Sequence, residues 1–217
     1  MDDVKLSGEQ SPAERRPHRG RTPQKESRDD WQTPPSFLDG LRQRWRFALD
    51  AACSLDNAVA LLGLTAEHSG LAHNWHPACG VGTQLHPTPP AARGSAVAVW
   101  CNPPYGYRGR MSRTFVARGA EQARDVCGPA GLDLVMLLGA TPDVRWFHEC
   151  VLGGPNPCDE VWFTQGRLAF IDPDRGEAAR QNTGGSALLV WRAGWRRPGG
   201  PFLGSLRRDG RPAGGAW

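Results

Sequence analysis

The stretch Ala96-Val97-Ala98-Val99-Trp100-Cys101, followed directly by Asn102-Pro103-Pro104-Tyr105, is the most informative part of this 217-residue chain. The first six residues form an apolar run with the length and composition of a buried strand. The two prolines lack backbone N–H groups, and Pro103 favours an extended conformation for Asn102. Asn102 to Tyr105 therefore form a rigid segment directly after the strand, which we call the ledge. Open α/β sheets bind ligands beyond the carboxyl ends of their strands, so we expect a ligand site here.

The ledge carries one amide side chain, two carbonyls without a neighbouring N–H, and one aromatic ring. Amide and carbonyl oxygens accept hydrogen bonds, and the ring offers a flat apolar face. This set suits a planar substrate with an exocyclic amino group. The alternative is a rigid exit from the strand with a buried Tyr105.

Composition narrows the class of protein. The length allows one α/β domain with a core, and the net charge of +4 is compatible with nucleic acid without arguing for it. No apolar run approaches the ~18 residues of a membrane span, and the charged N-terminus does not resemble a secretory leader. We therefore expect a cytoplasmic protein whose six cysteines are reduced. His73, His76 and Cys79 have a metal-like spacing but no convincing fourth ligand, so no metal is expected.

Three segments are expected along the chain. Residues 1–29 are polar and aperiodic and predict a disordered leader, and residues 30–192 carry the folded domain. Residues 193–217 are rich in Gly, Pro and Arg and predict a disordered basic tail. Because Arg192 to Trp217 contains six arginines and one acid, the tail is either a solubilising end or a phosphate-binding arm.

Apolar runs alternate with segments of helical periodicity in the predicted domain. Strands are expected at 47–50, 96–101, 132–138, 160–163, 167–171 and 186–191, and helices at 33–44, 111–126 and 144–151. The strands at 160–163 and 167–171 flank Thr164-Gln165-Gly166 and predict a hairpin. The alternation predicts an α/β fold with a mostly parallel sheet and right-handed crossovers. The Gly-, Pro- and His-rich segment 63–95 is expected to be a long loop that is functional or partly disordered.

Further motifs stand in order around the ledge. They are Asp30-Trp31-Gln32-Thr33-Pro34-Pro35, Phe47-Ala48-Leu49-Asp50-Ala51-Ala52, Gly70-Leu71 with Trp75, Val135-Met136-Leu137-Leu138, Trp146-Phe147-His148, Gly166-Arg167-Leu168 with Phe170, and Ser186-Ala187-Leu188. With the ledge, this series resembles the phage-type DNA N6-adenine methyltransferases over roughly residues 30 to 192. The Asn-Pro-Pro-Tyr motif alone also looks like that of protein-glutamine and some RNA methyltransferases. The combination with the upstream and downstream motifs is far more specific.

The resemblance implies a Rossmann-like S-adenosylmethionine-dependent fold, with a mostly parallel twisted sheet and helices on both faces. It implies site-specific methylation of the adenine N6 amino group in double-stranded DNA, with the target base flipped out of the duplex. It further implies a phage or prophage setting and a connection with restriction–modification. Two alternatives stay open: methylation of another planar amine (cytosine N4, an RNA base or a protein glutamine), and a non-catalytic DNA-binding relic.

The catalytic residues implied by the resemblance are Asn102, Pro103, Pro104 and Tyr105. The side-chain oxygen of Asn102 and the carbonyl of Pro103 would accept the two amine hydrogens and stabilise the positive charge that develops on nitrogen. No strong base is required, because the proton leaves easily once the nitrogen carries the methyl group and a positive charge. Tyr105 would stack on the flipped base.

The resemblance places the cofactor against Thr33, Pro34, Asp50, Ala51 and Ala52. Asp50 ends a predicted strand and would contact the amino-acid part of the cofactor, although it could also be only a turn former. Thr33-Pro34 starts a helix in either case. The loop after Asp50 lacks the glycine that most methyltransferases carry there.

Three arginines are expected to bind DNA. Arg108 and Arg110 follow the ledge in a polar loop, and Arg167 follows a Gly turn. Each could instead be a solvated or anchoring side chain. No segment is large enough for a separate target-recognition domain, so we expect a short or relaxed recognition site read by residues of the loops 63–95, 105–113 and 172–185.

Overall fold

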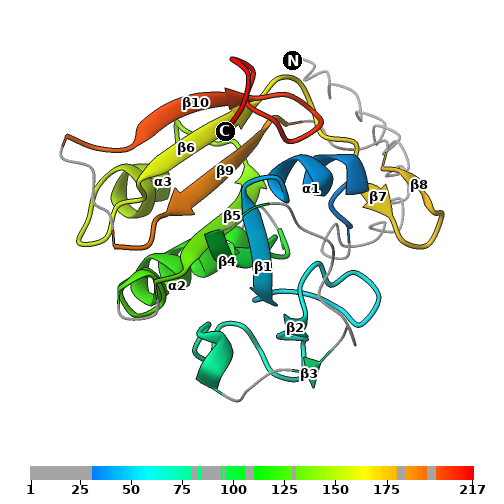
Figure 1. Cartoon of the computed structure of the whole chain (residues 1–217), viewed down its shortest axis with the longest axis horizontal. Coiled ribbons are helices and arrows are strands. Elements are labelled where there is room, and N and C mark those ends of the chain that lie inside the picture. The colour runs from blue at the N-terminus through cyan, green and yellow to red at the C-terminus, as the bar shows by residue number, and fades with distance from the viewer. Residues whose placement is uncertain are drawn as a thin grey trace, which may run out of the picture.

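The computed structural model describes residues 31–79, 83–84, 94, 96–105, 110–128, 131–179, 184–194 and 199–217. Within these residues the chain forms an eight-stranded sheet, ordered β10-β6-β9-β5-β4-β1-β2-β3, and a separate ribbon of β7 and β8 (Figure 1). The strands are β1 (Trp45–Asp50), β2 (Leu62–Gly63), β3 (Thr83–Gln84), β4 (Ala96–Cys101), β5 (Asp133–Gly139), β6 (Glu160–Thr164), β7 (Ile171–Asp172), β8 (Glu177–Ala178), β9 (Ser186–Trp191) and β10 (Phe202–Leu206). The helical segments are α1 (Pro35–Leu41), η2 (Pro77–Cys79), α2 (Arg110–Cys127), α3 (Arg145–Phe147) and η4 (His148–Leu152). The leader expected at 1–29 lies outside the described residues.

The sheet is mixed, with a parallel majority. Among the described strands, β1 runs parallel to β2 and β4, β4 to β5, and β6 to β10. Strand β9 is antiparallel to β5 and β6, and β3 is antiparallel to β2. The carboxyl ends of β1, β4, β5, β6 and β10 therefore lie at one edge of the sheet, which we call the carboxyl edge. The expected mostly parallel α/β sheet is confirmed.

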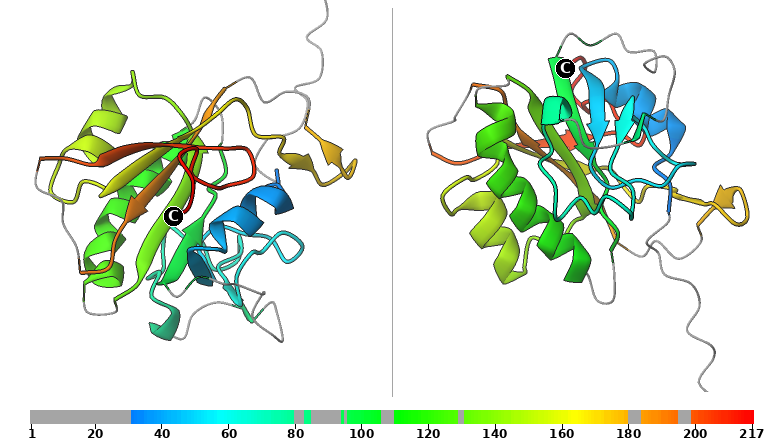
Figure 2. Two further views of the ribbon diagram at one scale, coloured as in Figure 1. Left: turned by 45° about the horizontal axis from the view of Figure 1, so that its top comes forward. Right: turned by 90° about the horizontal axis from the view of Figure 1, so that it is seen from below.

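Helices cover both faces of the sheet, as expected (Figure 2). Strand β5 is apolar on both sides, and its alternate residues enter two separate cores. Leu134, Met136 and Leu138 belong to the core cluster that includes residues of α2 and α3. Val135 and Leu137 belong to the cluster that includes residues of α1. This two-sided burial explains why β5 appears in the sequence as an unbroken apolar run.

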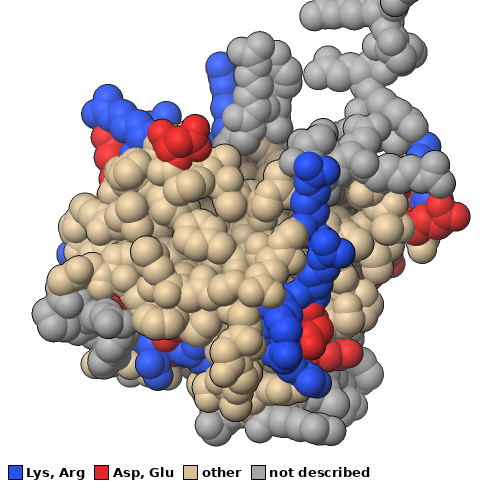
Figure 3. All heavy atoms as spheres, turned by 90° about the horizontal axis from the view of Figure 1, so that it is seen from above, with Lys and Arg blue, Asp and Glu red and all other residues tan. Residues whose placement is uncertain are grey.

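The C-terminal segment corrects one expectation. Residues 199–217 are not a disordered tail, because β10 pairs with β6 along its whole length. The ring of Trp217 packs edge-on against Trp45 and Trp162, at centroid distances of 5.0 and 5.2 Å. The amino-acid composition of this segment does not indicate a strand, because β10 is short and half exposed and its partners are distant in sequence. The folded domain extends to Trp217. Figure 3 shows this side of the molecule, where exposed basic side chains form a stripe.

The expected hairpin of 160–163 with 167–171 is also wrong. The first strand forms as β6, but its two edges are occupied by β9 and β10. The second stretch therefore has no edge of β6 to pair with. Ile171 instead exchanges backbone hydrogen bonds with Gln32 (2.9 and 3.0 Å) and starts the β7–β8 ribbon.

Candidate active site

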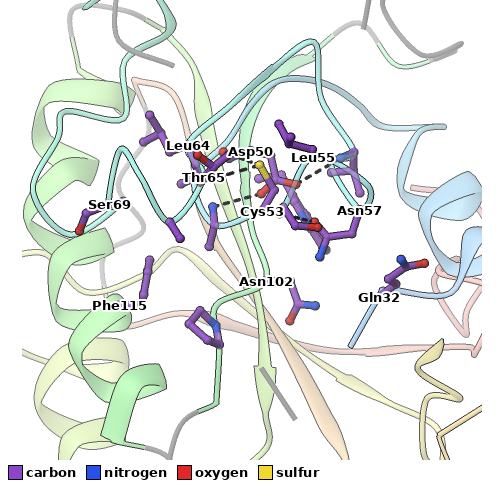
Figure 4. Close-up of a pocket in the computed structure, with 18 of the residues that line it drawn as sticks. Gln32, Asp50, Cys53, Leu55, Asn57, Leu64, Thr65, Ser69, Asn102 and Phe115 are labelled. Carbon is purple, nitrogen blue, oxygen red and sulfur yellow. Dashed lines mark hydrogen bonds between the residues drawn. The ribbon is translucent and has the colours of Figure 1, made fainter. Parts of the chain in front are cut away.

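A cavity of about 570 Å³ opens at the carboxyl edge between β1 and β4 (Figure 4). The ends of the two strands are adjacent, since Asp50 lies opposite Trp100 in the register. The chain continues from β1 to β2 on one side and from β4 to β5 on the other. Such a switch point in strand order leaves a crevice that binds ligands. The volume falls in the range of small-molecule sites, about 300–1,000 Å³.

Asn102 follows β4 directly and lines this cavity. Its Nδ2 donates a hydrogen bond to Oγ1 of Thr33 at 3.2 Å. Its Oδ1 is buried and has no hydrogen-bond partner among the described residues. Leaving a buried acceptor unpaired costs about 1–3 kcal/mol. The side chain is thus held by its nitrogen, while its buried oxygen is left without a hydrogen-bond donor.

Local sequence places the hydroxyl that holds Asn102. Pro34 occupies the N-cap position of α1, and its carbonyl accepts hydrogen bonds from the amides of Phe37 and Leu38. Proline suits this first turn because the missing N–H would have no helical partner. Thr33, immediately before it, is 8% exposed and faces the ledge.

Aromatic rings lie beside the ledge. Tyr105 meets Phe170 edge-on, with ring centroids 6.3 Å apart and planes at 81°. Phe170 is buried and stacks on Trp31, which also lines the cavity. The Gln32–Ile171 backbone pairing fixes the N-terminal segment to residues 170–171. Segments distant in sequence therefore form one aromatic wall next to Asn102.

Asp50 is almost fully buried at the end of β1. Its Oδ1 accepts a hydrogen bond from the amide of Ala52, and its Oδ2 accepts one from the amide of Val59, both at 3.2 Å. Burial raises the pKa of this carboxyl to about 7, and these two hydrogen bonds oppose the shift only in part. Asp50 therefore shapes the glycine-free turn after β1 while adding an ionisable group to the cavity wall.

The segment after β2 forms one wall of the cavity, and none of its residues is among the expected cofactor contacts. Its cavity-lining residues are Leu64, Thr65, Ala66, Glu67, Ser69, Gly70 and Leu71, and α2 adds Met111 and Phe115. Gly70 allows this wall to approach the turn after β1, since a Cβ there would fall on the carbonyl oxygen of Ala51. The Gly70-Leu71 motif was the only sequence signal for this wall.

The predicted site residues divide into two groups. The cavity is lined by Thr33, Asp50, Ala51, Ala52, Asn102 and Pro104. Outside its lining lie Pro34 at the N-cap of α1, the buried Pro103, and Tyr105 in the aromatic wall. Arg110 is the exposed first residue of α2, and Arg167 is exposed after the Gly166 turn. Arg108 lies outside the described residues.

In the described part of the chain, no three His, Cys, Asp or Glu side chains gather into a group that could hold a metal ion. None of the helices in that part has the length and apolar character needed to cross a membrane.

Fold and cavity together define an α/β domain of the doubly wound class, with a ligand-sized cavity at its switch point. The chain belongs to the DNA N-6-adenine-methyltransferase (Dam) family, whose profile matches residues 20–211. It is similar to the DNA N-6-adenine-methyltransferase of Escherichia phage T1, with 28% identity over 180 residues. That match covers 76% of this chain and 63% of the phage protein, so the chain spans less than two thirds of that relative's length.

Proposed function

We propose that this chain transfers the methyl group of S-adenosylmethionine to the N6 amino group of adenine in DNA. The observation that carries the proposal is the buried, unpaired Oδ1 of Asn102 at the wall of a ligand-sized cavity. An exocyclic amine supplies the hydrogen-bond donor that this oxygen lacks. Membership of the adenine-N6 family supports adenine as the base.

The residues present fit S-adenosylmethionine as the cofactor, which when bound supplies a methyl group on a positively charged sulfonium. The pKa of Asp50 is about 7, so its ionised form is available to a cationic ligand near neutral pH, and Glu67 and Ser69 offer polar atoms for hydroxyl groups. Met111 and Phe115 offer an apolar surface for a flat ring. Cofactor contacts are assigned to Thr33, Pro34, Asp50, Ala51 and Ala52, as the family resemblance implies.

Asn102 and Pro103 are assigned the catalytic step. One amine hydrogen is donated to Oδ1 of Asn102 and the other to the carbonyl of Pro103, which holds the nitrogen toward sp³ geometry and takes its lone pair out of conjugation with the ring. The same oxygens stabilise positive charge on the nitrogen during transfer, and they are in place before reaction because Thr33 holds the amide. Pro104 and Pro103 keep the ledge rigid.

The target base is assigned to the aromatic wall. A base inside a duplex cannot reach the ledge, so it must flip out at a cost of a few kcal/mol. Stacking of the base on Tyr105 offsets about 1–3 kcal/mol of the free energy of flipping. Arg108, Arg110 and Arg167 are assigned to the flanking DNA backbone, and we propose double-stranded DNA as the substrate.

The test is nucleoside analysis. Labelled S-adenosylmethionine is incubated with unmethylated duplex DNA, and the digested nucleosides are separated. We expect label in N6-methyladenine from the unaltered protein and none from Asn102→Ala at an unchanged melting temperature. Label confined to N4-methylcytosine, to RNA or to protein, or no transfer under any of these conditions, would overturn the proposal.

A further inference from the structure

The C-terminal segment brings arginines to the carboxyl edge of the sheet. Strands β6 and β10 are parallel, and both end at the edge that carries Asn102. Arg167 follows the turn after β6, whereas Arg207 and Arg208 follow β10 directly. All three are exposed. An edge that holds the candidate active site therefore continues into a basic surface.

The side chain of Arg208 lies close to the turn after β6. Gly166 has φ +80°, and a Cβ on it would lie 2.6 Å from Nη2 of Arg208. The side chain of Arg208 therefore lies across the Gly166 turn, next to Arg167. The turn after β10 is closed by backbone hydrogen bonds from the amide of Arg207 to the carbonyl of Arg211 (2.8 Å) and from the amide of Gly210 to the carbonyl of Arg207 (3.0 Å).

The charge of this turn is positive after its ion pairs are considered. Asp209 lies between Arg207 and Arg211, at 3.5 and 4.0 Å from their Nε atoms. One carboxylate faces two guanidinium groups, and both pairs are about half exposed. In the described part of the chain, Arg208 and Arg167 form no ion pair within 4.0 Å. The surface keeps a net positive charge available to a polyanion.

The distance of this surface from Asn102 suits a DNA backbone. Three strand spacings separate β4 from β6 and four separate β4 from β10, roughly 14–19 Å at about 4.8 Å per strand. Phosphates of one DNA strand follow each other at about 3.4 Å along the helix axis. The surface is thus about four to six nucleotides from a base bound at the ledge, within one turn of the duplex.

We propose that Arg207, Arg208 and Arg211, together with Arg167, form a surface that binds backbone phosphates of duplex DNA a few nucleotides from the target base. The proposal rests on the function proposed above, because it takes the ledge as the place of the flipped base. It gives the C-terminal segment a part in substrate binding as well as in the fold. Contacts to phosphate would position the duplex without reading its sequence.

The test compares salt dependences of binding. Affinity for an unmethylated duplex is measured by fluorescence anisotropy at several salt concentrations for the unaltered protein, Arg208→Gln and Arg167→Gln/Arg208→Gln. Each lost phosphate contact should lower the slope of log K against log salt by about 0.9, so the double variant should lose about 1.8. The matched control is Arg124→Gln, an exposed arginine in the last turn of α2, near the opposite edge of the sheet. It should leave the slope unchanged.

Failure of this surface can be told apart from failure of the proposed function. Equal slopes in the double variant, the control and the unaltered protein, with methyl transfer intact, would overturn the surface alone. A reduced slope on single-stranded DNA but not on duplex would also overturn it. If the unaltered protein transfers no methyl group to DNA, the proposed function fails. The slopes of log K against log salt still show whether these arginines bind DNA phosphates. Melting temperatures exclude loss of fold as the cause.

Discussion

At the scale of single residues, the hydrogen bond from Asn102 to Thr33 is the contact on which the proposed catalytic role of Asn102 depends. Thr33→Val keeps the side-chain shape but removes the hydroxyl that holds Nδ2 of Asn102. We expect kcat to fall about tenfold, equivalent to about 1.4 kcal/mol, since the acceptor oxygen is no longer oriented. Thr33→Ser keeps the hydroxyl and should retain most of the activity. Equal losses in both variants, measured by methyl transfer at saturating DNA and cofactor, would show that the hydroxyl does not position Asn102.

The buried carboxyl of Asp50 predicts a pH-dependent stability. Its pKa is raised from 3.8 to about 7, so the folded protein binds a proton that the unfolded chain has already released between those pH values. The contribution of this group to the free energy of unfolding therefore falls as the pH rises from about 4 to 7, by up to roughly 4 kcal/mol. Relative to the unaltered protein, Asp50→Asn should gain stability over this range and not beyond it.

Urea unfolding of the two proteins from pH 4 to 8, without ligand, measures that difference. Asparagine cannot accept both backbone hydrogen bonds, so the free energy of unfolding of the variant is lowered by an amount that does not vary with pH. The informative quantity is how the difference in free energy of unfolding between the two proteins changes with pH. Parallel pH profiles would show that Asp50 titrates as an ordinary carboxyl.

At the scale of elements, the cavity depends on how closely the segment after β2 approaches the turn after β1. A Cβ at Gly70 would fall on the carbonyl oxygen of Ala51, and the carbonyl of Gly70 also accepts a hydrogen bond from Nε1 of the buried Trp75. Gly70→Ala should therefore push one wall of the cavity away. We expect at least a tenfold loss of S-adenosylmethionine affinity by calorimetry. Gly184→Ala, where a Cβ would meet no atom within 4 Å, is the control and should bind normally.

At the scale of the whole molecule, the C-terminal residue closes the domain. Trp217 packs between Trp45 and Trp162, its Nε1 donates to the carbonyl of Gly40 at 3.1 Å, and the guanidinium of Arg44 lies 5.1 Å from its ring centroid. Trp217→Ala should lower the free energy of unfolding by about 2–4 kcal/mol, since it removes a large partly buried ring. Trp217→Phe should recover most of that loss. Urea unfolding in which the Ala variant matches the unaltered protein would contradict this packing.

Prediction from sequence succeeded where a pattern is local. Strands β4, β5 and β9 were found because burial on both faces produces unbroken apolar runs. The expectation of a disordered C-terminus failed because Trp217 acquires its partners only when residues more than fifty positions away come together. The hairpin expected after β6 failed because no local signal shows that both edges of β6 are occupied.

The α/β class, the rigid ledge at Asn102 and the family of the chain can all be inferred from the sequence alone. These properties follow from short stretches, namely apolar runs, prolines and ordered motifs, whose conformation depends on neighbouring residues. The folded structure is needed to see that Thr33 holds Asn102, that Oδ1 of Asn102 is unpaired, and that Arg167 and Arg208 share the edge of the candidate active site. Such relations depend on strand order and on the meeting of distant segments, which no single stretch of sequence encodes.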